Sequence, residues 1–102
     1  MARILILEPD PDVCALLARY VTALGHDSAE GDASVDLVVV EPGDRELAQA
    51  AADLAAARAD LPVICVSIYP ERAARPRFPA AAFMTKPVSL SDFGAALSAA
   101  LS

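Results

Sequence analysis

The sequence is poor in aromatic residues and in basic residues, and both shortages limit what the chain can do. There are three Phe and two Tyr among the 102 residues, and there is no Trp. Since hydrophobic residues still make up 56%, we expect a core of Val, Ile and Leu on strands, with Ala-rich helices packed closely against them. Eight Lys and Arg stand against fourteen Asp and Glu, which gives a net charge of −6. This charge argues against nucleic acid or an anionic membrane surface as a partner.

Cysteines and long apolar runs are also scarce. Cys14 falls in a helical pattern and Cys65 in a strand pattern, so no disulfide framework is predicted and both thiols are expected in the core. No apolar run approaches the ~18 residues that a membrane span needs. The apolar stretch in MARILILEPD is too short for a signal peptide. We therefore expect one domain, residues 1–102, located in the cytoplasm and without a membrane partner.

Five short apolar segments are predicted to be strands. They cover residues 3–7, 26–29, 37–40, 62–67 and 82–85; the second of them differs from the rest in being polar and weakly patterned, and it is predicted as a poor strand. Residues 37–40 show no alternation of polar and apolar side chains, which is typical of a strand covered on both faces in a parallel sheet.

Three helices are predicted from their start signals. The capping residues are Asp10 (with Pro11 in the first helical position), Asp44 and Ser89, and the helices end at Gly25, near Arg58 and at Leu101. Residues 68–79 contain three prolines and leave room for one helical turn at most.

The alternation of short strands and helices predicts an α/β fold, a doubly wound five-stranded parallel sheet of the flavodoxin-like kind. In such sheets the functional site lies beyond the carboxyl ends of the strands, where the first and third strands meet. Glu8 follows the first strand in ILILEPD, and Glu41 follows the third in LVVVEPG. We expect these two carboxylates to converge, with Ser67 and Lys86 facing the same crevice.

The sequence resembles the receiver domain of bacterial response regulators over nearly its whole length. The matching pieces are ILILEPDPDVCALLARYV, DLVVVE, PVICVS and AFMTKPVSLSDF. The resemblance implies the strand order 2-1-3-4-5. The segments after the second and fourth strands are short or broken by proline, so the family's second and fourth helices are expected to be shortened or missing.

The resemblance also implies a role for each residue at the predicted site. By position, Glu8 and Pro9, with Asp10 beside them, correspond to the family's metal-binding acids, and Glu41 corresponds to the phosphoacceptor. Ser67 corresponds to the switch hydroxyl, Phe83 to the switch aromatic and Lys86 to the lysine that contacts the phosphoryl group. The resemblance also implies that the bond before Pro87 is cis.

Two departures from the family predict that the site has lost its chemistry. Pro9 has no carboxylate, and Mg²⁺ is normally held by carboxylates, phosphate and water in near-octahedral geometry. Glu41 is one methylene longer than aspartate, and a misplacement of about 1 Å can cost on the order of a hundredfold in rate. We therefore expect a degenerate pseudo-receiver with no catalytic residue and no cofactor, although weak Mg²⁺ binding by Glu8 and Glu41 stays open.

Several readings of the remaining groups stay open from sequence alone. Glu41 is a solvent-wetted strand end, a mimic of the phosphorylated state, or part of a residual metal or phosphate site, and we hypothesise that Lys86 pairs with it. The alternative to a switch role is a strand-end hydroxyl bonded to backbone for Ser67 and a plain core residue for Phe83. The alternative to a metal-site role for Asp10 is a plain helix cap. His26 is predicted at the surface without a role.

The leading functional prediction is a non-enzymatic receiver-like module in two-component signalling that works without phosphorylation. Its partner is expected to be another signalling protein: a histidine kinase, a regulator, or a second copy in a homodimer. The contact face is expected between about Arg72 and Leu101. The alternative is a working phosphoacceptor that a histidine kinase phosphorylates with Mg²⁺. A third reading, a small-ligand binder using the crevice, is disfavoured by the acidic mouth and the absence of a Gly-rich phosphate loop.

Overall fold

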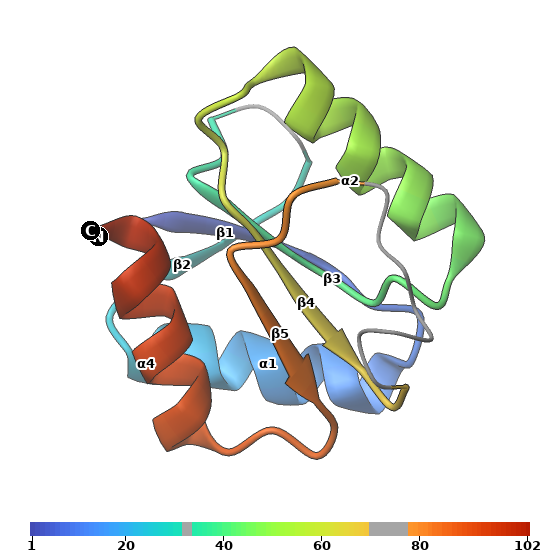
Figure 1. The fold of residues 1–102 in the computed structure, drawn as a ribbon. Helices are drawn as coiled ribbons and strands as arrows, with labels where there is room; N and C mark the ends of the chain where they lie inside the picture. Colours follow the sequence, from blue (N-terminus) through green and yellow to red (C-terminus); the bar gives the residue numbers. More distant parts are fainter. Residues whose placement is uncertain (32–33, 70–77) are drawn as a thin grey trace.

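The fold is a parallel sheet with helices on both faces (Figure 1). The computed structural model describes residues 1–31, 34–69 and 78–102. The strands are β1 (Arg3–Leu7), β2 (Asp27–Ala29), β3 (Leu37–Val40), β4 (Val63–Ser67) and β5 (Ala82–Thr85), and they lie in the order β2-β1-β3-β4-β5. The described helices are α1 (Pro11–Ala23), α2 (Arg45–Ala57) and α4 (Leu90–Leu101). The predicted fold class and strand order are confirmed.

The connection between β2 and β3 is short, as predicted. β2 ends at Ala29 and β3 begins at Leu37, and residues 30, 31 and 34–36 form no helix. The family's second helix is therefore missing from the described part of this connection. The expected loss of the fourth helix concerns residues 70–77, which lie outside the described residues. No helix in the described ranges is long and apolar enough to cross a membrane.

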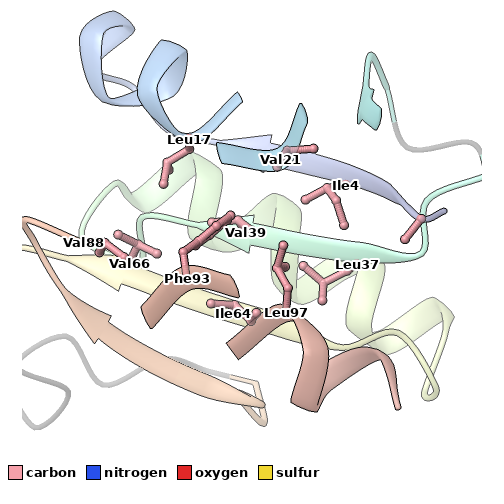
Figure 2. Close-up of a cluster of buried hydrophobic side chains, with 11 residues drawn as sticks. Ile4, Leu17, Val21, Leu37, Val39, Ile64, Val66, Val88, Phe93 and Leu97 are labelled. Carbon is pink, nitrogen blue, oxygen red and sulfur yellow. The ribbon is translucent and has the colours of Figure 1, made fainter. Parts of the chain in front are cut away.

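Two hydrophobic cores lie on the two faces of the sheet. On one face α1 and α4 pack over a cluster that includes Ile4, Ile64 and Phe93 (Figure 2). On the other face α2 packs over a second cluster. Successive side chains of a strand point to opposite faces, so the four fully buried residues of β3 alternate between the two clusters. The prediction that this strand is covered on both sides is confirmed.

The helix caps are where the sequence placed them. Oδ1 of Asp10 accepts hydrogen bonds from the N–H groups of Asp12 (2.9 Å) and Val13 (3.3 Å). Asp44 and Ser89 accept from the third residue of their helices in the same way. Gly25, at φ +86°, ends the segment after α1 in the left-handed region that favours glycine. Asp10 and Asp44 therefore fix α1 and α2 directly after the ends of β1 and β3.

Candidate functional site

The carboxyl ends of β1, β3 and β5 bring three charged side chains together. Leu7 pairs with Val40 in the parallel register, and the N–H of Glu41 donates to the carbonyl of Leu7 at 2.9 Å, so the next residues, Glu8 and Glu41, emerge side by side. Lys86 Nζ lies 2.7 Å from Oε1 of Glu8 and donates a hydrogen bond to Oε1 of Glu41 at 3.1 Å. The predicted contact with Glu41 is present, and the closer contact with Glu8 adds to it.

The two Glu-Pro tips use the same turn to hold their carboxylates. Oε2 of Glu8 accepts a hydrogen bond from the N–H of Asp10, and Oε2 of Glu41 accepts one from the N–H of Gly43, both at 3.1 Å. Because proline has no N–H, the residue after it is the first that can donate back to the glutamate. Each carboxylate therefore gives one oxygen to the backbone and the other to Lys86.

The cluster formed by Glu8, Glu41 and Lys86, here called the Lys86 clamp, is largely shielded from solvent. The side chains are 2%, 9% and 14% exposed, in that order. Burial on its own lowers the pKa of Lys86, but the nearby carboxylates of Glu8 and Glu41 outweigh it and raise the pKa above its ordinary value. Lys86 is thus an ammonium at neutral pH, held between two acidic side chains. The reading of Glu41 as a solvent-wetted strand end is wrong, because burial and the ion pair remove it from solvent.

Ser67 is fully buried, and its hydroxyl is used locally. Its Oγ accepts a hydrogen bond from the N–H of Tyr69 at 3.1 Å. The backbone N–H of Lys86 donates to the carbonyl of Ser67 at 2.8 Å, but within the described ranges no hydrogen bond joins the Ser67 hydroxyl to the side chains of the Lys86 clamp. The geometry matches the reading of a strand-end hydroxyl bonded to backbone, and the switch role of Ser67 stays a prediction.

Phe83 is half-buried and packs against the core cluster on the α2 face. It occupies an ordinary core position of β5, so its switch role likewise stays a prediction. The Lys86–Pro87 bond is cis, as the resemblance implied.

The residues present do not make a convincing magnesium site. Among the described residues no three His, Cys, Asp or Glu side chains are grouped so that they could hold a metal ion. Pro9 offers no ligand, and the carboxylate of Asp10 is used as a helix cap. Lys86 and backbone N–H groups lie against the oxygens of Glu8 and Glu41, so the ammonium partly neutralises these acids.

Two side chains that hold segments together near the ends of the strands were not predicted from the sequence. The hydroxyl of Tyr20 donates to the carbonyl of Val88 at 2.9 Å and so ties α1 to the segment that follows Lys86. The only available signal was a Tyr on the apolar face of a helix. His26, predicted at the surface without a role, is half-buried, and its Nδ1 accepts from the N–H of Ala2 at 2.9 Å. Cys65 is buried as expected, and Cys14 is only partly buried.

Comparison with known proteins identifies similar structures. No protein-family model and no curated protein matches the sequence. The receiver domain of PhyR from Erythrobacter litoralis is 27% identical, with a TM-score of 0.78 over 98% of this chain and 89% of that one. The response regulator TrrA from Thermotoga maritima, solved with Mg²⁺-BeF, is 18% identical with a TM-score of 0.80 over 99% and 100% of the two chains.

An orphan response regulator of H. pylori is 17% identical, with a TM-score of 0.77 over 99% of this chain and 97% of that one. At the identities of these last two structures the likeness shows a shared fold and no more. The resemblance to receiver domains is confirmed: the chain has the receiver fold, and the solved structures that it resembles include response regulators and a response regulator receiver domain.

Proposed function

We propose that this chain is a receiver-like signalling module that acts by contact with another protein and is not phosphorylated. The observation that carries the proposal is the Lys86 clamp. Oε1 of Glu41 accepts from Lys86, and Oε2 accepts from the N–H of Gly43. The residue that stands at the phosphoacceptor position therefore has both oxygens engaged.

The absence of a fitting metal site supports the same proposal. Phosphoryl transfer relies on positioning and on a divalent cation that neutralises the developing charge. A Mg²⁺ ion between Glu8 and Glu41 would have to displace the ammonium of Lys86 with one acidic ligand fewer than the family has, because Pro9 takes its place. The module is accordingly non-enzymatic, and it requires no cofactor.

The partner is a signalling protein: a histidine kinase, a regulator, or a second copy of this chain. The net charge of −6 disfavours nucleic acid and anionic membrane surfaces, and a cytoplasmic location fits such partners. For the contact face we keep the segment from about Arg72 to Leu101, of which residues 78–101 are described.

Incubation with acetyl phosphate and Mg²⁺, followed by intact-mass measurement, tests the proposal. We expect the mass to stay unchanged. A species heavier by one phosphoryl group that hydroxylamine removes would reject the proposal in favour of the working phosphoacceptor. A receiver domain with an intact acidic site, treated in parallel, controls for the activity of the phosphodonor.

A double variant tests whether the residues at positions 9 and 41, and not other parts of the chain, account for the loss of Mg²⁺ binding. Pro9→Asp with Glu41→Asp restores the acid that is missing and shortens the acceptor, so we expect Mg²⁺ binding by calorimetry that the natural sequence does not show. If the double variant binds no Mg²⁺, these two positions are not the ones that silenced the site, and the shortened connections between strands become the cause.

A further inference from the structure

The two edges of the sheet are protected unequally against pairing with another chain. β2 forms one edge and β5 the other (Figure 1). β2 has three residues, its Asp27 is charged and exposed, and the exposed Glu30 follows directly. Short strands and charged side chains are the usual means by which proteins keep an edge from pairing. β5, with the sequence Ala-Phe-Met-Thr, carries no charge. β5 is therefore the less protected edge.

The outer side of β5 carries backbone groups without a partner. The N–H of Ala81 donates to the carbonyl of Val63 at 2.8 Å, on the β4 side. Successive residues of a strand direct their backbone groups to opposite sides, so Phe83 also faces β4, whereas Ala82 and Met84 face outward. Apart from the ladder between β4 and β5, no hydrogen bond among the described residues reaches the backbone of Ala82 or Met84. Each of these two residues therefore offers one donor and one acceptor to a further strand.

The chain around this edge is poor in charge. Lys86 and Asp92 are the only charged residues between positions 78 and 102, although the chain contains eight basic and fourteen acidic residues. Lys86 is 14% exposed and held by two glutamates, whereas Asp92 is exposed. Two copies of a chain with a net charge of −6 repel each other where acidic surfaces meet. A charge-poor edge lets two copies approach, whereas a basic partner would favour an acidic surface.

β5 is also complementary to a second copy of itself. In an antiparallel pair whose two-fold axis passes through Phe83, Ala82 of each copy lies opposite Met84 of the other, and each such pair exchanges both N–H···O bonds. The outward backbone groups of both residues are then used. Ala82 and Met84 belong to the face covered by α1 and α4, so a large side chain meets a small one there. On the α2 face Phe83 meets Phe83, and aromatic cross-strand pairs stabilise a sheet.

The surface beside the edge leaves room for such a neighbour. A groove of about 320 Å³ runs between β5 and α4, and its lining includes Met84 and Thr85 of β5 and Ala95 and Ala96 of α4. Ala95 is exposed. Because the side chains that α4 presents there are small, they do not hold a second copy away from the edge.

We propose that β5 pairs antiparallel with β5 of a second copy of this chain, which joins the two sheets into one continuous sheet across a two-fold axis. Such a contact is isologous, since each copy contributes the same residues. The inference rests on the proposed function, because it names a second copy as the protein through which the module acts. A contact made by one short strand is small, so the association is weak and depends on protein concentration.

Sedimentation equilibrium from micromolar to millimolar protein tests the association. We expect the average mass to rise towards twice that of the single chain. Added NaCl should strengthen the association, because salt screens the repulsion between two acidic chains. Amide exchange in ¹⁵N-labelled protein locates the contact: the N–H groups of Ala82 and Met84 should exchange more slowly at millimolar than at micromolar concentration, and those of β2 should not change.

Two variants at one position test the backbone pairing. Ala82→Pro removes an outward N–H and keeps the ladder to β4, since proline is tolerated as the first residue of a strand and where the N–H faces solvent. It should weaken the association at least about tenfold, because the symmetric contact loses this donor from both copies. Ala82→Ser keeps the N–H and nearly the same size, so it should leave the association unchanged.

A chain that stays monomeric at millimolar concentration overturns the proposal. So do slower exchange confined to other segments, association that NaCl weakens, and equal association of Ala82→Pro and the natural chain. Should Ala82→Pro fail to fold, amide exchange in the natural chain decides. A monomeric chain leaves the proposed function in place with a different signalling protein as partner. Phosphorylation by acetyl phosphate rejects the proposed function and leaves these association measurements unaffected, so the two failures are distinguishable.

Discussion

The ends of β1 and β3 carry the same short sequence, Glu-Pro, and the structure uses them in nearly the same way. In each, the residue after proline donates its N–H to Oε2 of the glutamate, and an aspartate then caps the next helix. The two ends differ in how they meet Lys86. Glu8 is 2% exposed and 2.7 Å from the ammonium, whereas Glu41 is 9% exposed and 3.1 Å away.

This difference shows which acid the lysine compensates more strongly. The resemblance to receiver domains predicts a metal-ligand position for Glu8 and the acceptor position for Glu41. A buried carboxylate is costly unless it is paired. Among the described residues Oε1 of Glu8 accepts no hydrogen bond, and its compensation is the ion pair with Lys86 at 2.7 Å. Lys86 therefore joins the two strand ends through ion pairs with both glutamates.

The largest expected effect comes from removing the lysine that joins the two ends. Lys86→Met keeps an unbranched side chain, one atom shorter than that of lysine, and leaves two shielded carboxylates unpaired, so we expect the free energy of unfolding to fall by about 3–5 kcal/mol. Urea unfolding measures this loss. Adding Glu8→Gln and Glu41→Gln to the variant should recover most of it; a loss under about 1 kcal/mol for Lys86→Met alone would mean that solvent already screens the clamp.

The comparison itself is tested by neutralising each end separately. Glu8→Gln should cost about 1–2 kcal/mol and Glu41→Gln less, because the Glu8 carboxylate is closer to Lys86 and more buried. In each variant the lysine keeps one carboxylate, which limits the loss. Equal costs, or the reverse order in urea unfolding, would show that the shorter distance carries no energetic weight.

Two substitutions distinguish a helix-capping role of Asp10, after the end of β1, from a role as a metal ligand. Asp10→Ala removes a helix cap and should cost about 1 kcal/mol. Asp10→Asn, the matched control, caps equally well and should change the stability by only a few tenths of a kcal/mol. A large loss for Asp10→Asn in thermal or urea unfolding would indicate that the charge of Asp10 matters beyond the cap.

The smallest expected effect is a loss of stability at alkaline pH. The folded pKa of Lys86 is raised, so its contribution is fully present below the unfolded value of about 10.4 and is lost as the pH rises through the folded value. The difference in unfolding free energy between the natural chain and Lys86→Met should thus stay constant from neutral pH to about pH 10 and shrink above it. A difference that already shrinks near neutral pH would contradict the raised pKa.

Much of the fold followed from local patterns that do not depend on the rest of the chain. The bounds of β1, β3 and β5 were predicted to the residue, because short apolar runs ended by proline or polar residues leave little choice. The capping positions of Asp10, Asp44 and Ser89 were also predicted, since a cap depends only on a side chain and the backbone two or three residues later. The convergence of Glu8 and Glu41 followed from the parallel sheet.

What the sequence by itself determined about this protein is its set of strands and helices and the meeting of two acids at one edge of the sheet. Only the tertiary structure decided that Lys86 lies closer to Glu8 than to Glu41, that Glu41 is buried, and that Tyr20 ties α1 to Val88. The reason is physical: an ion pair or a tertiary hydrogen bond depends on distances between segments far apart in the chain, and these are set by how the helices pack on the sheet.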